Sequence, residues 1–205
     1  MCIRDRCKIN DPGEAPLRRL TPTQYNNTIS DLLGYSEAAW GDISEDEEES
    51  AWPWQFPTDI EIHGFEGNAE GQVASAYLIE QYQAAASHFS GFVADSPAFW
   101  ACDPDSGSES EQMQCAQSSM LRFATRAYRR PLTAEEQDRL TAFFQGNVVE
   151  WGVSDGIRLT AQSVLMTPQF LYRLEGLQAE GGKKPEALSD FCLLYTSPSP
   201  RDGTK

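Results

Sequence analysis

Helix-start signals followed by apolar residues at helical spacing recur along this chain, and they limit the folds that it can adopt. Thr21 opens a capping box that Gln24 completes, with Pro22 at the first helical position. A second capping box joins Thr133 to Glu136. Sustained alternation of polar and apolar residues, which would indicate strands, is absent. The sequence therefore predicts a mainly α protein made of small helical bundle domains.

The predicted helices are separated by one long irregular segment. Helices are expected over residues 22–33, 75–93 and 111–129, after Thr133, and after a cap at Ser154, with a kink or restart at Thr167 and Pro168. The helix after Thr133 is expected to bury Leu140, Phe143 and Phe144. The apolar positions of the other helices are Tyr25, Ile29, Leu32, Leu33, Leu78, Tyr82, Ala85, Phe89, Phe92, Met113, Met120, Ala124, Ala127, Tyr128, Ile157, Ala161, Val164, Leu165, Phe170, Leu171 and Leu174, with Ile79 and Ala86 beside the stripe of their helix. Residues 35–71 show no sustained period and are expected to form a long acidic and aromatic loop.

This loop holds the residues that could form a binding surface. Its acidic run, residues 44–50, is expected to be a solvated loop, with calcium binding as the alternative. Trp52, Trp54 and Phe56 would pack over the helices or form a platform for a sugar or a protein partner. His63 lies in a glycine-rich stretch, where a turn with left-handed backbone competes with a role as ligand or catalyst.

The coding sequences of the two ends are expected to come from one artificial DNA element. Residues 1–6 can be encoded by ATG TGT ATA AGA GAC AG, and residues 192–197 by TGT CTC TTA TAC ACA TCT. These strings are reverse complements over most of their length and resemble a transposase mosaic end, and residues 198–202 resemble the adapter that follows it. Such segments are set aside in reasoning about fold. We therefore expect residues 1–6 and 192–205 to be translated sequencing adapter around an incomplete native segment.

The chain is strongly acidic, and this excludes several kinds of partner. Its formal net charge is -15, which becomes -17 when the four bases and two acids of the adapter segments are removed. Such a charge repels phosphate backbones and anionic lipid surfaces, so no nucleic acid partner is expected. No apolar run reaches the roughly 20 residues that a spanning helix requires, so no membrane span is expected.

The cysteines indicate an oxidising compartment. Once Cys2 and Cys192 are assigned to the adapter, Cys7, Cys102 and Cys115 remain. Cys102 and Cys115 bracket a polar loop before a helix-like stretch, which predicts a disulfide and therefore export, with two reduced thiols in a cytosolic protein as the alternative. Cys7 lies beside the upstream break, and a partner for it would lie upstream.

The signatures of well-known catalytic and cofactor sites are absent from the sequence. It has no Cys-x-x-Cys-His haem motif, no phosphate-binding glycine loop and no Gly-x-Ser-x-Gly nucleophile motif. Two histidines, His63 and His88, are too few for a multi-histidine metal site, and His88 is expected at a helix surface or core edge. No cofactor, metal ligand or catalytic residue is therefore assigned. Arg129 and Arg130 are expected to interact with the carbonyl end of the helix that precedes them.

Several segments resemble a family of large exported proteins of planctomycetes and myxobacteria. They are residues 17–34 (LRRLT and YNNTISDLLG), 123–133 (FATRAYRRPLT), 163–175 (SVLMTPQFLYRLE) and 187–191 (ALSDF). Members of this family carry a series of domains of unknown function, often beside a planctomycete-type cytochrome c domain. The resemblance covers most of the native segment, and its motifs occur in the family's order.

This resemblance implies a domain organisation, a location and a partner. It implies an N-terminal domain over residues 7–100, a helical domain over 101–178, and a linker with the truncated start of a main domain over 179–191. It also implies a place outside the cytoplasm, in the periplasm or at the cell surface, near a c-type cytochrome domain in the same or a separate chain. Haem would then lie in another part of the full-length protein, because these residues carry no haem motif.

Three classes of function follow. The first is an accessory helical region, without chemistry of its own, in an exported cytochrome-associated protein. The second is the N-terminal part of an exported enzyme whose active site lies in a downstream domain, with the long loop as a lid. The third is a module that binds polysaccharide or protein through Trp52, Trp54 and Phe56.

Overall fold

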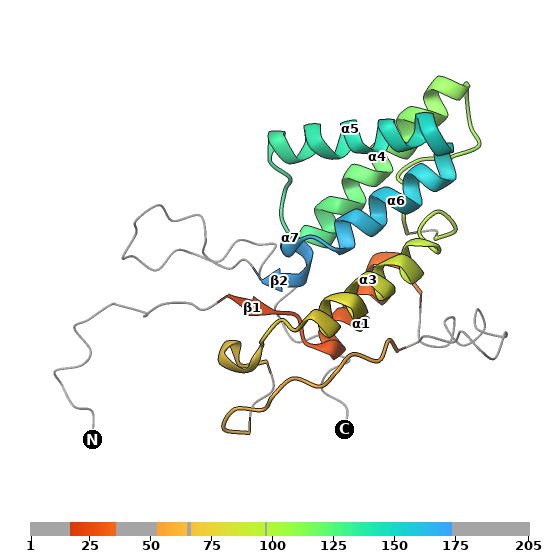
Figure 1. The fold of residues 1–205 in the computed structure, drawn as a ribbon. Helices are drawn as coiled ribbons and strands as arrows, with labels where there is room; N and C mark the ends of the chain where they lie inside the picture. Colours follow the sequence, from red (N-terminus) through yellow and green to blue (C-terminus); the bar gives the residue numbers. More distant parts are fainter. Residues whose placement is uncertain (1–16, 36–52, 65–66, 97, 174–205) are drawn as a thin grey trace, which may run out of the picture.

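The computed structural model describes residues 17–35, 53–64, 67–96 and 98–173, which form a mainly α-helical structure (Figure 1). Its elements are β1 (Arg18–Arg19), α1 (Pro22–Leu33), the 3-10 turn η1 (Ala69–Gly71), α3 (Ala76–Ser90), α4 (Glu109–Tyr128), α5 (Ala134–Trp151), α6 (Val153–Leu165), α7 (Pro168–Leu171) and β2 (Tyr172–Arg173). The prediction of a mainly α fold is confirmed.

Some predictions concern residues outside the described ranges. They are the adapter segments 1–6 and 192–205, Cys7, the acidic run 44–50, Trp52, Leu174 and the expected linker and domain start at 179–191. For the loop at 35–71, the structure describes residues 53–64 without a helix and places η1 near its end.

One hydrophobic core connects the early and the late helices. Helix α6 packs against α3, α4 and α5, and α1 packs against α4 (Figure 1). Phe89 of α3, Phe123 of α4 and Ile157 of α6 are buried members of this core. The core therefore crosses residue 100, where the sequence predicted a boundary between two domains, and that division stays a prediction.

Local signals placed most of the helix starts correctly. The capping boxes of Thr21 with Gln24 and of Thr133 with Glu136 are both formed. The side chain of Ser75 accepts a hydrogen bond from the backbone of Leu78 and so caps α3, which ends at Ser90 rather than near residue 93. Helix α7 begins directly after Thr167, as the expected restart.

Two helix starts differ from the prediction. Helix α4 begins at Glu109, two residues earlier than expected, where Ser108 donates both its backbone N–H and its hydroxyl to the carboxylate of Glu111. Ser154 is not an N-cap: α6 begins at Val153, and Gly152, with a φ of 85°, forms the whole turn after α5. The left-handed backbone of Gly152 lets the two helices follow each other without the longer loop that a Ser154 cap would need.

Two close approaches between neighbouring parts of the chain explain why glycine occupies the points of contact. A side chain at Gly34, which ends α1 with a φ of 69°, would place its Cβ 2.8 Å from the Cβ of Ala98. At Gly156 of α6, a Cβ would collide with the side chain of Val148 on α5. The absence of a side chain at both positions thus sets the distance between neighbouring elements.

A short antiparallel ribbon, which the sequence did not predict, joins the two ends of the described fold. Arg18 lies opposite Arg173 and Arg19 opposite Tyr172, and the backbone N–H of Leu20 donates to the carbonyl of Leu171 at 2.8 Å. Two-residue strands are too short to show the polar and apolar alternation by which strands are recognised.

Candidate functional site

The segment 53–59, called the strap here, lies across helices α1 and α3. The side-chain amide of Asn26 on α1 pairs with the backbone of Trp54 in both directions, donating to its carbonyl and accepting from its N–H, each at 3.1 Å. The indole of Trp54 lies 5.7 Å from the ring of His88 and 6.0 Å from that of Phe89, measured between ring centroids. The strap is therefore attached to the bundle through its backbone and through its side chains.

The residues of the predicted binding surface have different environments. Phe56 packs edge-on against Tyr25, at 4.8 Å, and tilted on Tyr82, at 5.0 Å. Trp54 and Phe56 are half-buried and cover the core. His63 is exposed in a turn and has a φ of 55°, so it takes the left-handed backbone expected for that turn. A binding role for Trp54, Phe56 and His63 stays a prediction, while Trp52 lies outside the described residues.

A buried charged cluster anchors the far end of the strap. The guanidinium of Arg19 on β1 forms an ion pair with Asp59, and donates a second hydrogen bond to the phenol oxygen of Tyr82. The side chain of Arg19 is 2% exposed and that of Asp59 is 9% exposed. Burial raises the pKa of Tyr82, and the charge of Arg19 opposes this increase. Charged Arg19 is therefore paired with Asp59 and with the neutral phenol of Tyr82 within the fold.

The outer edges of the ribbon are covered by side chains. The amide of Gln72 donates to the backbone carbonyl of Arg19 and accepts from its N–H, at 2.9 and 2.7 Å. On the other strand, Arg129 donates to the carbonyl of Tyr172 at 3.0 Å. Because backbone groups at a strand edge can recruit another strand, these side chains satisfy them within the molecule.

Two arginines of the segment 123–133 donate to carbonyls at the ends of other helices. Arg126 donates to the carbonyls of Asp31 and Leu32 at the end of α1, at 2.7 and 3.2 Å. Arg129 donates to the carbonyls at the end of α7, where its shortest bond, to Phe170, is 2.8 Å. Arg129 thus donates to the end of α7 and Arg130 to Glu136, and the predicted favourable interaction of these two arginines with the carbonyl end of α4 stays a prediction. Carbonyls at a helix end attract cations from any element that brings them close.

Arg130 instead pairs with a carboxylate at the start of α5. Its guanidinium donates two hydrogen bonds to Glu136, at 2.8 and 2.6 Å, and the same carboxylate accepts from the backbone N–H of Thr133. These bonds, led by that from Arg130, lower the pKa of Glu136 to about 2. The capping box and the ion pair thus share one carboxylate.

This arrangement predicts an acid-dependent loss of stability. Because the pKa of Glu136 is lower in the folded than in the unfolded chain, the carboxylate stabilises the fold above pH 5 and ceases to do so as the pH falls toward 2. We expect Glu136→Gln to cost about 1–2 kcal/mol at pH 7 and only about a quarter of that at pH 2.5. Urea unfolding at both pH values measures the difference. A cost that is equal at the two pH values would contradict the assigned role of the carboxylate.

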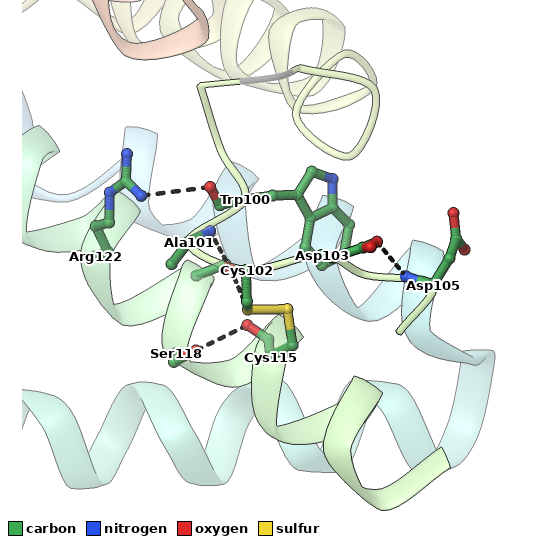
Figure 2. The surroundings of a disulfide bond; sticks show 9 residues. Trp100, Ala101, Cys102, Asp103, Asp105, Cys115, Ser118 and Arg122 are labelled. Atoms are coloured by element: carbon green, nitrogen blue, oxygen red, sulfur yellow. Dashed lines mark hydrogen bonds between the residues drawn. A yellow bond between two sulfur atoms is a disulfide. The ribbon is translucent and has the colours of Figure 1, made fainter. Parts of the chain in front are cut away.

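A disulfide joins the predicted pair, Cys102 and Cys115, with their α carbons 5.9 Å apart (Figure 2). This spacing lies within the range that the bond requires. Cys102 is exposed in the loop before α4, whereas Cys115 is 8% exposed in the second turn of that helix. The structure thus supports the pairing that indicated an oxidising compartment.

Neither a metal cluster nor a membrane-crossing helix is found among the residues that the structure describes. Within those ranges, no three His, Cys, Asp or Glu side chains are grouped as a metal site would require. None of the described helices has both the length and the apolar character to cross a bilayer. An open groove on the first turns of α4 is lined by Glu109, Ser110, Met113, Gln114 and Gln117.

The comparisons with known proteins match two parts of this structure. Residues 18–91 match PSD3, a family described as a protein of unknown function (DUF1587). Residues 115–175 match PSD5, a second family with the description protein of unknown function (DUF1595). No curated protein and no solved structure gave a match. The chain therefore carries two segments that resemble domains of unknown function, in this order.

Proposed function

We propose that this chain is an accessory helical region of a longer, exported, cytochrome-associated protein, in which it holds neighbouring domains in position. The observation that carries the proposal is that arginines of the family-like motifs make contacts within the bundle. Arg19 comes from the first of these segments and Arg126 and Arg129 from the second, and each donates to a group within the bundle. Residues that serve ligands usually keep their polar groups directed at a cleft.

The same contacts bring the motifs together in space. Arg19, in the first segment, pairs with Tyr172 of the third across the ribbon. Arg129, in the second, binds the carbonyl of Tyr172. A rigid junction of this kind suits a spacer that fixes the relative positions of its neighbours. The proposed neighbours are the main domain beginning near residue 187 and a c-type cytochrome domain, in the same chain or in a separate one.

Export to the periplasm or cell surface is part of this proposal and is supported by the disulfide, since such bonds persist in oxidising compartments. The strap supports an accessory role over the polysaccharide-binding alternative. The rings of Trp54 and Phe56 pack on the bundle, where Phe56 contacts Tyr25. A sugar platform instead requires an open aromatic face.

We expect the chain to fold cooperatively without haem and to acquire none. The protein should be expressed in the periplasm together with the haem attachment machinery, purified, and examined by absorption spectroscopy and thermal unfolding. The expected result is one cooperative transition and no Soret band, because covalent attachment requires a cysteine motif that the sequence lacks. A stoichiometric Soret band would disprove the accessory role. Retention on a polysaccharide column that Trp54→Ala abolishes would favour a binding module instead.

A further inference from the structure

The short segment before the disulfide is held to α4 by contacts that do not involve sulfur. The hydroxyl of Ser119 accepts from the backbone N–H of Ala101 at 2.9 Å. Arg122 donates to the carbonyl of Trp100 at 3.3 Å (Figure 2). Arg126 donates to the carbonyl of Ala98 at 3.1 Å. Spaced three and four residues apart, these side chains lie along one face of α4. They would keep residues 98–101 in place if the disulfide were broken.

The segment after Cys102 is attached differently. Within residues 103–112, the hydrogen bonds join near neighbours: Asp105 and Ser106 donate to Asp103, Ser108 donates to Glu111, and Gln112 to Ser108. Such bonds shape the loop and the first turn of α4, but they do not attach either to another helix. The disulfide is therefore a cross-link that ties the end of this segment, at Cys115, back to the docked residues 98–101.

We propose that the Cys102–Cys115 disulfide is a redox-sensitive clasp, opened by a dithiol reductant that attacks the sulfur of Cys102. Cys102 is the accessible partner, whereas Cys115 is 8% exposed. Exchange requires access to the sulfur that is attacked. The clasp holds residues 103–115 in place, and four of these residues, Glu109, Ser110, Met113 and Gln114, line the α4 groove.

The exchange has two balanced steps. A thiolate of the reductant bonds to the sulfur of Cys102, the bond between the cysteines breaks, and Cys115 leaves as a thiolate that takes up a proton. The second thiol of the reductant then displaces Cys102 from the mixed disulfide. Both cysteines end as thiols, and the reductant ends as its own disulfide.

Hydrogen exchange, followed by mass spectrometry, tests the clasp on the full 205-residue chain. Dithiothreitol should make the amides of residues 112–115 exchange at least about tenfold faster, because the start of α4 then opens locally. Amides in residues 119–128 and in α6 should keep their rates. The double variant Cys102→Ser with Cys115→Ser should reproduce this pattern without reductant. Unchanged rates at 112–115, or a rise throughout α4 and α6, would overturn the proposal.

The site of attack is tested separately. The oxidised chain is mixed briefly with glutathione, quenched with acid, alkylated and mapped by peptide mass spectrometry. Adducts on Cys102 should exceed those on Cys115 at least about tenfold in the folded protein. The same reaction in about 8 M urea, which unfolds the chain, serves as the control. The preference for adducts on Cys102 should then disappear. Equal adducts in the folded protein would disprove attack at Cys102.

Discussion

Replacing Asp59 by alanine should lower the free energy of unfolding by about 3–5 kcal/mol, because it leaves the charge of Arg19 buried without its counter-ion. The side chain of Arg19 is 2% exposed, so water cannot take the place of the carboxylate without opening the strap. A loss of this size is a large fraction of the roughly 5–15 kcal/mol that holds a typical domain together. Urea unfolding of the wild type and the variant measures it.

Three further variants separate charge from packing. Asp59→Asn keeps an acceptor for Arg19 and should cost less than Asp59→Ala. Glu61→Ala removes an exposed carboxylate two residues further along and should change stability by no more than about 0.5 kcal/mol. Arg19→Met combined with Asp59→Leu removes both charges and should recover much of the loss. If Asp59→Ala were no more costly than Glu61→Ala, the ion pair would not anchor the strap.

Local signals explain why so much of the helical fold could be predicted. A capping box satisfies backbone groups with side chains three residues away, so Thr21 and Thr133 act within a few residues of sequence. The disulfide was also predictable, because Cys102 and Cys115 are close in sequence and bracket a polar loop. The fold class and these features depend on short-range chemistry.

The anchoring contacts could not be predicted, because their partners are distant in sequence. Arg19 and Asp59 are 40 residues apart, and Arg126 lies 95 residues from Asp31, whose carbonyl it binds. Nothing in the periodicity around Asp59 distinguishes it from the other acids of the same loop. A buried arginine is recognisable only when the surrounding elements are in place. The arginines of the family-like segments could be singled out from the sequence. The groups that they bind could be identified only from the tertiary structure.

Helix α5 shows how a correct helix can have a wrongly assigned face. The sequence predicted that Phe143 and Phe144 are both buried, but Phe143 is 46% exposed and Phe144 only 1%. The buried residues of α5 are Glu136, Leu140 and Phe144. They are four residues apart and form the narrow buried face of a helix at the outside of the bundle. Ile79 of α3, which the sequence placed beside the apolar stripe, is 51% exposed. Periodicity identifies an apolar stripe, and the number of neighbouring helices sets how wide a stripe is covered.

These adjacent phenylalanines give a matched test of the core. Phe144→Ala should cost about 3–5 kcal/mol, because it removes a buried ring and leaves a cavity where α5 packs on α6. Phe143→Ala makes the same chemical change one residue away and should cost less than about 1 kcal/mol, because nearly half of that side chain is already in water. Urea unfolding of both variants, with far-UV circular dichroism to confirm that each remains helical, measures the two costs. Equal costs would mean that α5 is rotated about its axis relative to the structure, and that Phe143 also faces the core.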